Sequence, residues 1–238
     1  MSELRTALVV GEHMRLFRRL GEEAQFLYVQ RLKGFSVPTS PHFESDDAAA
    51  WFVDKLQNSQ VYLEFGSGGS TYLAAKLKKR FVTVDSDYFF LKAVRKKIVE
   101  DGLLDNERQR YRYANIGITR RWGWPLGLLK PGKKRLALYS KYSDFPLDEL
   151  RGAYPDLVLI DGRFRVACAL KAIRALGARA NWCLVVDDYR HREGHYKIIE
   201  RFAELQSFVG RMAVFSKMPQ LDNRALMVAI RRYETDPS

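Results

Sequence analysis

The stretch from Val61 to Thr71 places an acid at the end of an apolar run and follows it with a turn. Val61 to Phe65 has the length and composition of a buried strand, and it contains Glu64. A turn of glycines and serines follows, and Tyr72 to Lys78 then has a helical composition. A second apolar run ends in Asp85, about 20 residues beyond Glu64, the spacing at which a β-α-β unit places an acid beside a bound ribose. The pattern favours nucleoside binding over a purely structural turn.

The glycines of this turn leave the backbone open to a ligand. Gly66 and Gly68 lack the Cβ that would hold a ligand away from the main chain. A dinucleotide-binding fingerprint needs a third glycine where Thr71 stands, so the pattern acid-x-Gly-x-Gly, which begins at Glu64, is the better description. We expect Ser70 or Thr71 to cap the helix that follows, because a short side-chain oxygen satisfies a free N–H of the first turn.

Strand-like and helix-like segments alternate along the rest of the chain. Further strands are expected within 111–117, 156–161 and 181–188, and helices within 45–56, 88–100, 166–176 and 193–205. This alternation predicts an α/β fold, with a mostly parallel sheet covered by helices on both faces. Two late apolar runs, 211–215 and 225–230, are expected to form a closing antiparallel pair.

The predicted strands bring several acids to one edge of the sheet. Asp161 ends one strand and the pair Asp187-Asp188 ends the next. Ligands of open α/β sheets bind beyond the carboxyl ends of the strands, so these acids should meet in one crevice. Crowded carboxylates raise one another's pKa or need a cation between them, and oxygen ligands suit Mg²⁺. The alternative is a metal-free ion-pair network, because Arg163 and Arg165 lie beside Asp161 in the sequence.

The segment Glu64-Phe-Gly-Ser-Gly68 resembles the first motif of class I S-adenosylmethionine (SAM)-dependent methyltransferases. The resemblance implies a Rossmann-like fold with a seven-stranded sheet and an antiparallel last strand. It also implies that the acid and turn hold the methionine part of SAM, that Asp85 holds the ribose hydroxyls and that Asn115 meets the adenine, although Asn115 could be a simple turn residue. The residues matched to cofactor binding are Glu64, Gly66, Ser67, Gly68, Ser70, Thr71, Asp85, Ser86, Asn115, Asp161 and Gly162. Ser70 departs from the glycine that is usual there.

Asp161 and Asp187-Asp188-Tyr189 resemble the metal site of macrocin-type sugar O-methyltransferases. That resemblance implies Mg²⁺ bound by Asp161, Asp187 and Asp188, and methylation of a sugar or other hydroxylated small molecule. We expect His191, three residues after Asp188, to act as the base, with a surface histidine as the alternative. Ile160 to Ala169 also resembles a segment of uncharacterised bacterial methyltransferase-like proteins. The expected catalytic residues are Asp161, Asp187, Asp188 and His191.

The net charge of +12 is concentrated in the middle of the chain. Residues 120–141 hold seven basic residues and no acidic one, with the sequence Trp122-Gly-Trp-Pro125 among them. Such a field favours an anionic partner, although a solvated basic face explains it equally well. We therefore expect a small-molecule acceptor, which could be anionic, and keep a nucleic-acid methyltransferase and a non-catalytic SAM-binding protein as alternatives.

The 238 residues suit one α/β domain with additions. We expect helices in residues 1–58, a SAM-binding domain in 59–238, and a basic, Trp-rich insertion at about 118–154. No apolar run is long enough to span a membrane. Cys168 and Cys183 lie in apolar patterns, which favours buried thiols and a cytoplasmic location. The sequence does not predict the oligomeric state.

Overall fold

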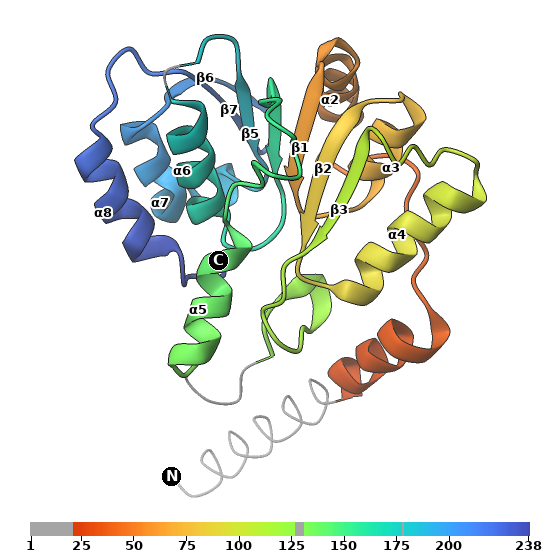
Figure 1. Ribbon diagram of the computed structural model, residues 1–238. Coiled ribbons are helices and arrows are strands. Elements are labelled where there is room, and N and C mark those ends of the chain that lie inside the picture. The colour runs from red at the N-terminus through yellow and green to blue at the C-terminus, as the bar shows by residue number, and fades with distance from the viewer. Residues whose placement is uncertain (1–20, 127–130, 178) are drawn as a thin grey trace, which may run out of the picture.

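Seven strands form one sheet in the computed structural model, which describes residues 21–126, 131–177 and 179–238 (Figure 1). The strand order is β3-β2-β1-β4-β5-β7-β6. Strands β1 to β5 pair in parallel, whereas β7 is antiparallel to both β5 and β6. The strands are β1 Val61–Phe65, β2 Arg80–Asp85, β3 Gln109–Tyr113, β4 Leu157–Ile160, β5 Cys183–Val186, β6 Glu204–Val209 and β7 Met212–Ser216. The predicted Rossmann-like α/β sheet is confirmed.

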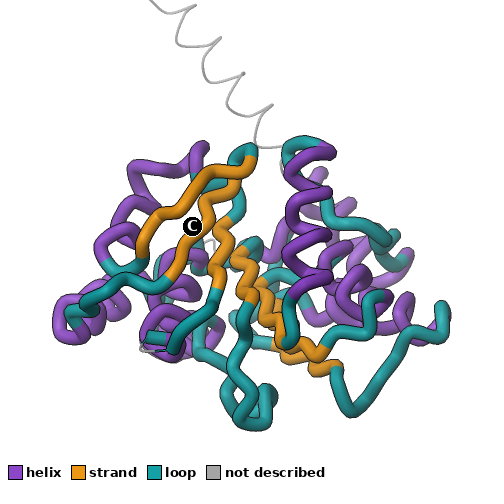
Figure 2. Tube along the Cα trace, turned by 90° about the horizontal axis from the view of Figure 1, so that it is seen from above, coloured by secondary structure: helices purple, strands orange, loops and turns teal. Residues whose placement is uncertain are grey.

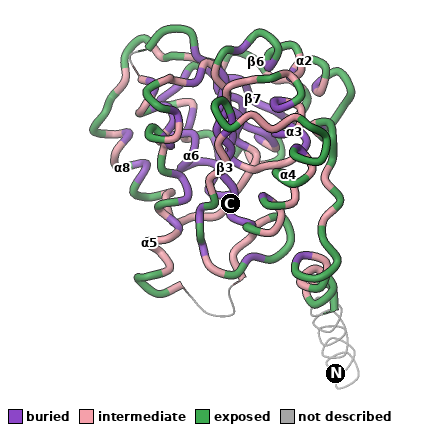
Figure 3. Tube along the Cα trace, turned by 45° about the vertical axis from the view of Figure 1, so that its right-hand side comes forward, coloured by how far each residue is buried: buried purple, intermediate pink, exposed green. Residues whose placement is uncertain are grey.

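Helices cover both faces of this sheet, as the view along it shows (Figure 2). Buried side chains of α2 Asp46–Asn58, α3 Gly69–Lys76 and α4 Tyr88–Glu100 pack on one face. Those of α5 Lys133–Tyr142, α6 Arg165–Leu176 and α8 Asn223–Tyr233 pack on the other. Neighbouring β1 residues point to opposite faces, with Tyr62 in the first core and Leu63 in the second. The inner strands of the sheet are accordingly largely buried, whereas the edge strands β3 and β6 are more exposed (Figure 3).

Short polar side chains begin several of these helices. The Ser45 hydroxyl accepts a hydrogen bond from the Ala48 N–H at the start of α2. The Asp87 carboxylate accepts from the N–H groups of Phe89 and Phe90 at the start of α4. These contacts satisfy backbone donors that have no partner within the helix. The start of α4 is thereby fixed directly after β2, where the site is formed.

The C-terminal region differs from the sequence prediction. The closing antiparallel pair is β6 with β7, and residues 225–230, which were expected to form a strand, lie in helix α8. Leu226, Ala229 and Ile230 are the buried residues of α8, a helical spacing that an apolar run of six residues does not distinguish from a strand. The helix expected over 193–205 is a short helix, α7 Glu193–Tyr196, followed by a 3-10 turn and then β6. Gly210, with φ +56°, supplies the tight turn between β6 and β7.

Of the helices expected in residues 1–58, the structure describes α2 and a helical segment from 21 to 33, which ends at Gly34. The positions before 21 lie outside the described residues, as do 127–130 in the predicted insertion. Gln30 is buried, and its side-chain amide donates to the Asp87 carboxylate at 2.7 Å and to the Thr119 hydroxyl at 3.2 Å. This contact fixes the segment 21–33 beside the carboxyl ends of the strands. The predicted domain boundaries stay a prediction.

Candidate cofactor and acceptor site

A cavity of about 740 Å³ lies beyond the carboxyl ends of β1, β2, β4 and β5, the lower edge of the sheet in Figure 1. The segments after these strands line it, together with the loop 121–124 and the segments that carry Phe26, Phe35 and His42. Asp85, Asp161, Asp187 and Asp188 all border this cavity, so the predicted convergence of strand-end acids is observed, with Glu64 as the exception. The predicted residues Gly66, Ser67, Gly68, Ser70, Ser86 and Gly162 line it as well.

Glu64 lies beneath the glycine turn and has no exposed surface. Its carboxylate accepts hydrogen bonds from the Tyr62 phenol at 2.8 Å, the Ser70 hydroxyl at 2.6 Å and the Thr71 hydroxyl. The Ser70 hydroxyl, one of the two expected caps, binds Glu64 instead, whereas the Thr71 hydroxyl also accepts from the Gly68 N–H at 2.9 Å at the start of α3. In this arrangement Glu64 sets the shape of the turn from below.

The fold requires glycine at position 66 but not at position 68. Gly66 has φ +105°, and a Cβ there would lie 2.6 Å from the Gly162 amide nitrogen, so the contact between β1 and β4 requires glycine. A Cβ on Gly68 would meet no atom of the described part of the chain within 4 Å, yet Gly68 lines the cavity. The fold therefore does not require a glycine at position 68, whereas a ligand that approaches the backbone would.

Asp85 is held by the same turn. One carboxylate oxygen accepts from the Ser67 N–H at 2.8 Å and from the Ser67 hydroxyl at 2.6 Å, and the other accepts from the Asp87 N–H at 2.7 Å. Burial raises the pKa of Asp85, and these hydrogen bonds oppose the rise. The Ser86 hydroxyl donates to the Gly123 carbonyl at 3.2 Å, which ties the Trp-rich loop to the end of β2.

The stability of the fold should depend on pH through Glu64. Burial raises the pKa of Glu64 from 4.5 to about 7. The folded protein therefore holds this proton more tightly than the unfolded chain does. The proton stabilises the fold fully below the unfolded pKa of Glu64. As pH rises to about 7, this contribution, about 3 kcal/mol of unfolding free energy, is lost. We expect Glu64→Gln to have a flatter stability profile than the wild type from about pH 5 to pH 8, measured by urea unfolding. Equal slopes for the two proteins would contradict this assignment.

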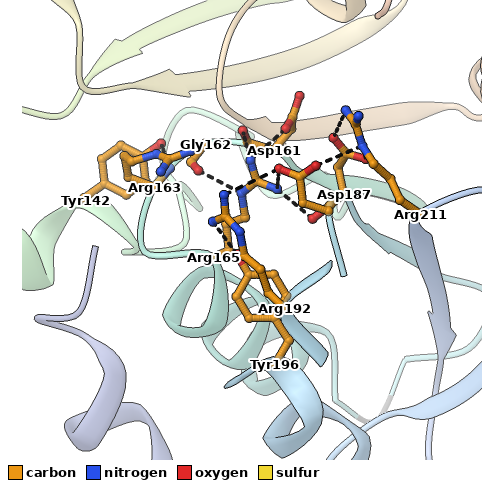
Figure 4. Close-up of polar contacts among 10 residues, drawn as sticks. Tyr142, Asp161, Gly162, Arg163, Arg165, Asp187, Arg192, Tyr196 and Arg211 are labelled. Atoms are coloured by element: carbon orange, nitrogen blue, oxygen red, sulfur yellow. Dashed lines mark hydrogen bonds and ion pairs between the residues drawn. The ribbon is translucent and has the colours of Figure 1, made fainter. Parts of the chain in front are cut away.

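Arginines neutralise the three acids of the substrate side (Figure 4). Arg165, which is 3 % exposed, contacts Asp161 and Asp188 at 3.1 Å each. Arg211 donates to both carboxylate oxygens of Asp187, at 3.0 and 2.9 Å, and lies 2.9 Å from Asp188. Enclosure raises the pKa of Asp161, and Arg165 opposes that rise. The sequence suggested Arg163 and Arg165 as partners of the acids but missed Arg211, which lies in the turn directly before β7.

This arrangement does not fit the magnesium site that the sequence suggested. A metal ion needs free carboxylate oxygens, and guanidinium groups already contact those of Asp161, Asp187 and Asp188. Among the described residues, no cluster of three or more His, Cys, Asp or Glu side chains could hold a metal ion. The ion-pair network, the alternative from the sequence, is the arrangement observed.

Four predicted site residues do not line the cavity: Glu64 and Thr71 are buried beneath the turn, and His191 and Asn115 lie elsewhere. His191 is exposed and borders a separate shallow hollow beside Arg190 and Gly194. Asn115 is exposed, and its side-chain oxygen accepts from the Gly117 N–H at 2.8 Å, as in a turn. The cavity instead includes His42, in a proline-rich connector whose pattern gave no sign of a site.

The aromatic residues of the predicted insertion divide into two groups. Tyr139 and Tyr142 are buried on α5 and pack on Phe164, so they fix the segment to the core. Trp122 and Trp124 both line the cavity, and Trp122 is 79 % exposed at its rim. Only part of the insertion therefore faces the site.

The strand order, the glycine turn and the acid at the end of β2 define the class I methyltransferase fold, which confirms the resemblance drawn from the sequence. Among solved structures, a methyltransferase-like protein from Silicibacter pomeroyi is 27% identical, covers 84% of this chain and 100% of its own, and has a TM-score of 0.68. This likeness agrees with the predicted class of SAM-dependent methyltransferases.

Two other solved structures are similar at a lower level. An O-methyltransferase from Bacillus cereus, in complex with S-adenosylhomocysteine (SAH), is 18% identical, with 82% and 91% of the two chains covered and a TM-score of 0.45. The O-methyltransferase TomG from Streptomyces achromogenes, in complex with SAM, is 13% identical, with 83% and 97% covered and a TM-score of 0.46. Similarities at this level do not indicate which reaction the protein catalyses.

No protein-family model and no curated protein matches the chain. Within the described residues, no helix is long and apolar enough to cross a membrane.

Proposed function

We propose that the protein transfers a methyl group from SAM to a hydroxyl of a small molecule bound in the same cavity. The observation that carries this proposal is the Gly66–Gly68 turn, which is fixed from below by Glu64 and borders one cavity with Asp85 and Asp161. Gly68 leaves the backbone open to the cofactor, and Asp85 offers oxygens to the ribose hydroxyls. SAM supplies a methyl group on a sulfonium, which is already a good leaving group.

The remaining work of the protein is to align the acceptor and to remove its proton. Asp161 lines the cavity, and its raised pKa suits a group that takes up a proton. We therefore assign Asp161 as the base, in place of His191, which lies outside the cavity. Asp187 and Asp188 would act through Arg165 and Arg211, as the groups that position Asp161. No metal ion takes part in this scheme, because the acids are engaged by arginines.

Asp85→Asn tests the cofactor assignment. The substitution removes the charge from the hydrogen bonds to the ribose, each worth about 1.5–3 kcal/mol, so we expect SAH to bind about 10- to 100-fold more weakly. Isothermal titration calorimetry measures this loss, and Asp144→Asn, which changes an exposed carboxylate outside the cavity, should bind SAH as the wild type does. Failure of the wild-type protein to bind SAM or SAH would refute the proposed function itself.

A nucleic-acid substrate is the second candidate, favoured by the exposed Trp122 beside the exposed Arg121 at the rim of the cavity. An exposed indole can stack on an unpaired base, and a nearby arginine can meet a phosphate. Retention on RNA that falls steeply as salt rises would favour this candidate over a small-molecule acceptor.

SAM binding without methyl transfer to any fraction of a cell extract would favour a non-catalytic protein. A cytoplasmic location stays a prediction from the free thiols of Cys168 and Cys183.

A further inference from the structure

Arg163 is a buried cation for which the described residues provide no carboxylate. It is 5 % exposed, and two of its guanidinium nitrogens, Nε and Nη1, are buried and have no hydrogen-bond partner in residues 21–126, 131–177 and 179–238. Arg165, the other buried arginine of the described chain, contacts two acids and three backbone carbonyls. An unpartnered buried N–H costs about 1–3 kcal/mol, and more when the group is charged. A protein keeps such a group where a partner arrives from outside the chain.

The surroundings of Arg163 fix it at the wall of the cavity. Its guanidinium lies 4.7 Å from the ring centroid of Trp124, and its backbone N–H donates to the Tyr142 phenol at 3.2 Å. Arg163 and Trp124 both line the cavity, and in Figure 4 Arg163 lies beside Tyr142, at the opposite end of the drawn residues from Arg211. Burial lowers the pKa of Arg163 to about 10, which leaves the group charged at neutral pH. The cavity therefore contains a fixed positive charge with free donors.

We propose that Arg163, stacked on Trp124, binds an anionic group of the methyl acceptor. The acceptor is then a hydroxylated small molecule that also carries a carboxylate or a phosphate. A guanidinium presents parallel N–H donors that match the two oxygens of either group, and the aromatic face holds its plane in place. This inference rests on the proposed function, because it places the acceptor in the SAM cavity.

The position of Arg163 relative to Asp161 supports the acceptor as the source of the anion. The two residues flank Gly162 after β4, and both line the cavity. When the acceptor hydroxyl contacts Asp161, the Arg163 guanidinium is therefore close by to bind the carboxylate or phosphate of the same molecule. SAM itself carries a carboxylate in its methionine part, and this second source of the same chemistry must be separated by experiment.

The test titrates inorganic phosphate and, separately, acetate into SAH-loaded protein by calorimetry at constant ionic strength. We expect millimolar binding to the wild type, and at least about a tenfold loss in Arg163→Gln, since charge-assisted hydrogen bonds are removed. Arg163→Lys should give an intermediate affinity, because lysine keeps the positive charge but lacks the two parallel N–H donors of the guanidinium. Arg190→Gln is the matched control: Arg190 also lies over an aromatic ring, that of Phe208 at 4.4 Å, but outside the cavity. Thermal unfolding verifies that each variant is folded.

Cofactor titrations separate the two sources of the anion. Under our proposal Arg163→Gln binds both SAH and 5′-methylthioadenosine, which lacks the amino-acid part, as the wild type does. A loss confined to SAH would assign Arg163 to the carboxylate of the cofactor and overturn the proposal. Equal phosphate and acetate affinities in the wild type and Arg163→Gln, or no binding of either anion to the wild type, would overturn it as well. Should the wild type fail to bind SAH, the proposed function is lost, and phosphate titration of the protein alone still decides whether Arg163 forms an anion site.

Discussion

Gly68→Ala should lower the affinity for SAH by about 100-fold, or roughly 2.7 kcal/mol, with no loss of thermal stability. The backbone at Gly68 is extended, with φ 166°, so alanine adopts it without strain. Within 4 Å the added Cβ would meet none of the atoms that the structure describes, and it would lie in the cavity. Only a ligand that approaches the main chain at this turn would be excluded by that methyl group. Calorimetry with SAH and thermal unfolding measure the two effects separately.

Two other glycines provide controls for this experiment. Gly194 lies outside the cavity in α7, and a Cβ there also meets nothing within 4 Å, so Gly194→Ala should leave SAH binding unchanged. Gly66→Ala should instead destabilise the fold, because its Cβ would lie 2.6 Å from the Gly162 backbone. Unchanged SAH affinity in Gly68→Ala would show that no ligand reaches the turn and would contradict the cofactor assignment.

The sequence predicts the nucleotide-binding half of the site because its signals are local. Glu64, the glycine turn and Asp85 lie within one β-α-β unit, and parallel strands bring their carboxyl ends together wherever that unit forms. The convergence of Asp161 and Asp187 on the same cavity follows from the same rule. Local composition thus places carboxylates at an edge of the sheet, but it does not say which atoms surround them.

The surroundings of those carboxylates depend on contacts between distant segments. Arg211 reaches Asp187 because β7 pairs antiparallel with β5, whereas the sequence analysis expected the run 211–215 to pair with 225–230. Glu64 was expected to contact the cofactor, but the hydroxyls of Ser70 and Thr71 donate hydrogen bonds to the Glu64 carboxylate and cover it. His191 was chosen for its distance from Asp188 along the chain, whereas Asp188 has φ +57°, which changes the direction of the chain directly after β5. Each of these departures comes from a geometry that residue spacing does not encode.

Asp187→Ala should destabilise the fold by about 3 kcal/mol. This value is near the low end for breaking a buried ion pair, because Arg211 keeps its contact with Asp188 in the variant. Asp187 is 1 % exposed, and both of its carboxylate oxygens accept from Arg211, so its loss leaves guanidinium donors in a partly buried place without their partner. Urea unfolding of the EDTA-treated protein measures the effect. Glu100→Ala, which breaks an exposed pair with Lys96 at 3.4 Å, is the control and should change stability by less than about 0.5 kcal/mol.

The sign of this change separates the two interpretations of the acidic cluster. If Asp187 were a ligand of a metal-binding site, removing one of three crowded carboxylates would relieve repulsion in the metal-free protein, and Asp187→Ala would be as stable as the wild type or more stable. If Asp187 instead neutralises Arg211, the metal-free protein loses stability, as predicted. Asp187→Asn keeps the shape and removes the charge, so it should fall between the wild type and Asp187→Ala. A stabilised Asp187→Ala would therefore reject the ion-pair network as the role of these acids and restore the metal site.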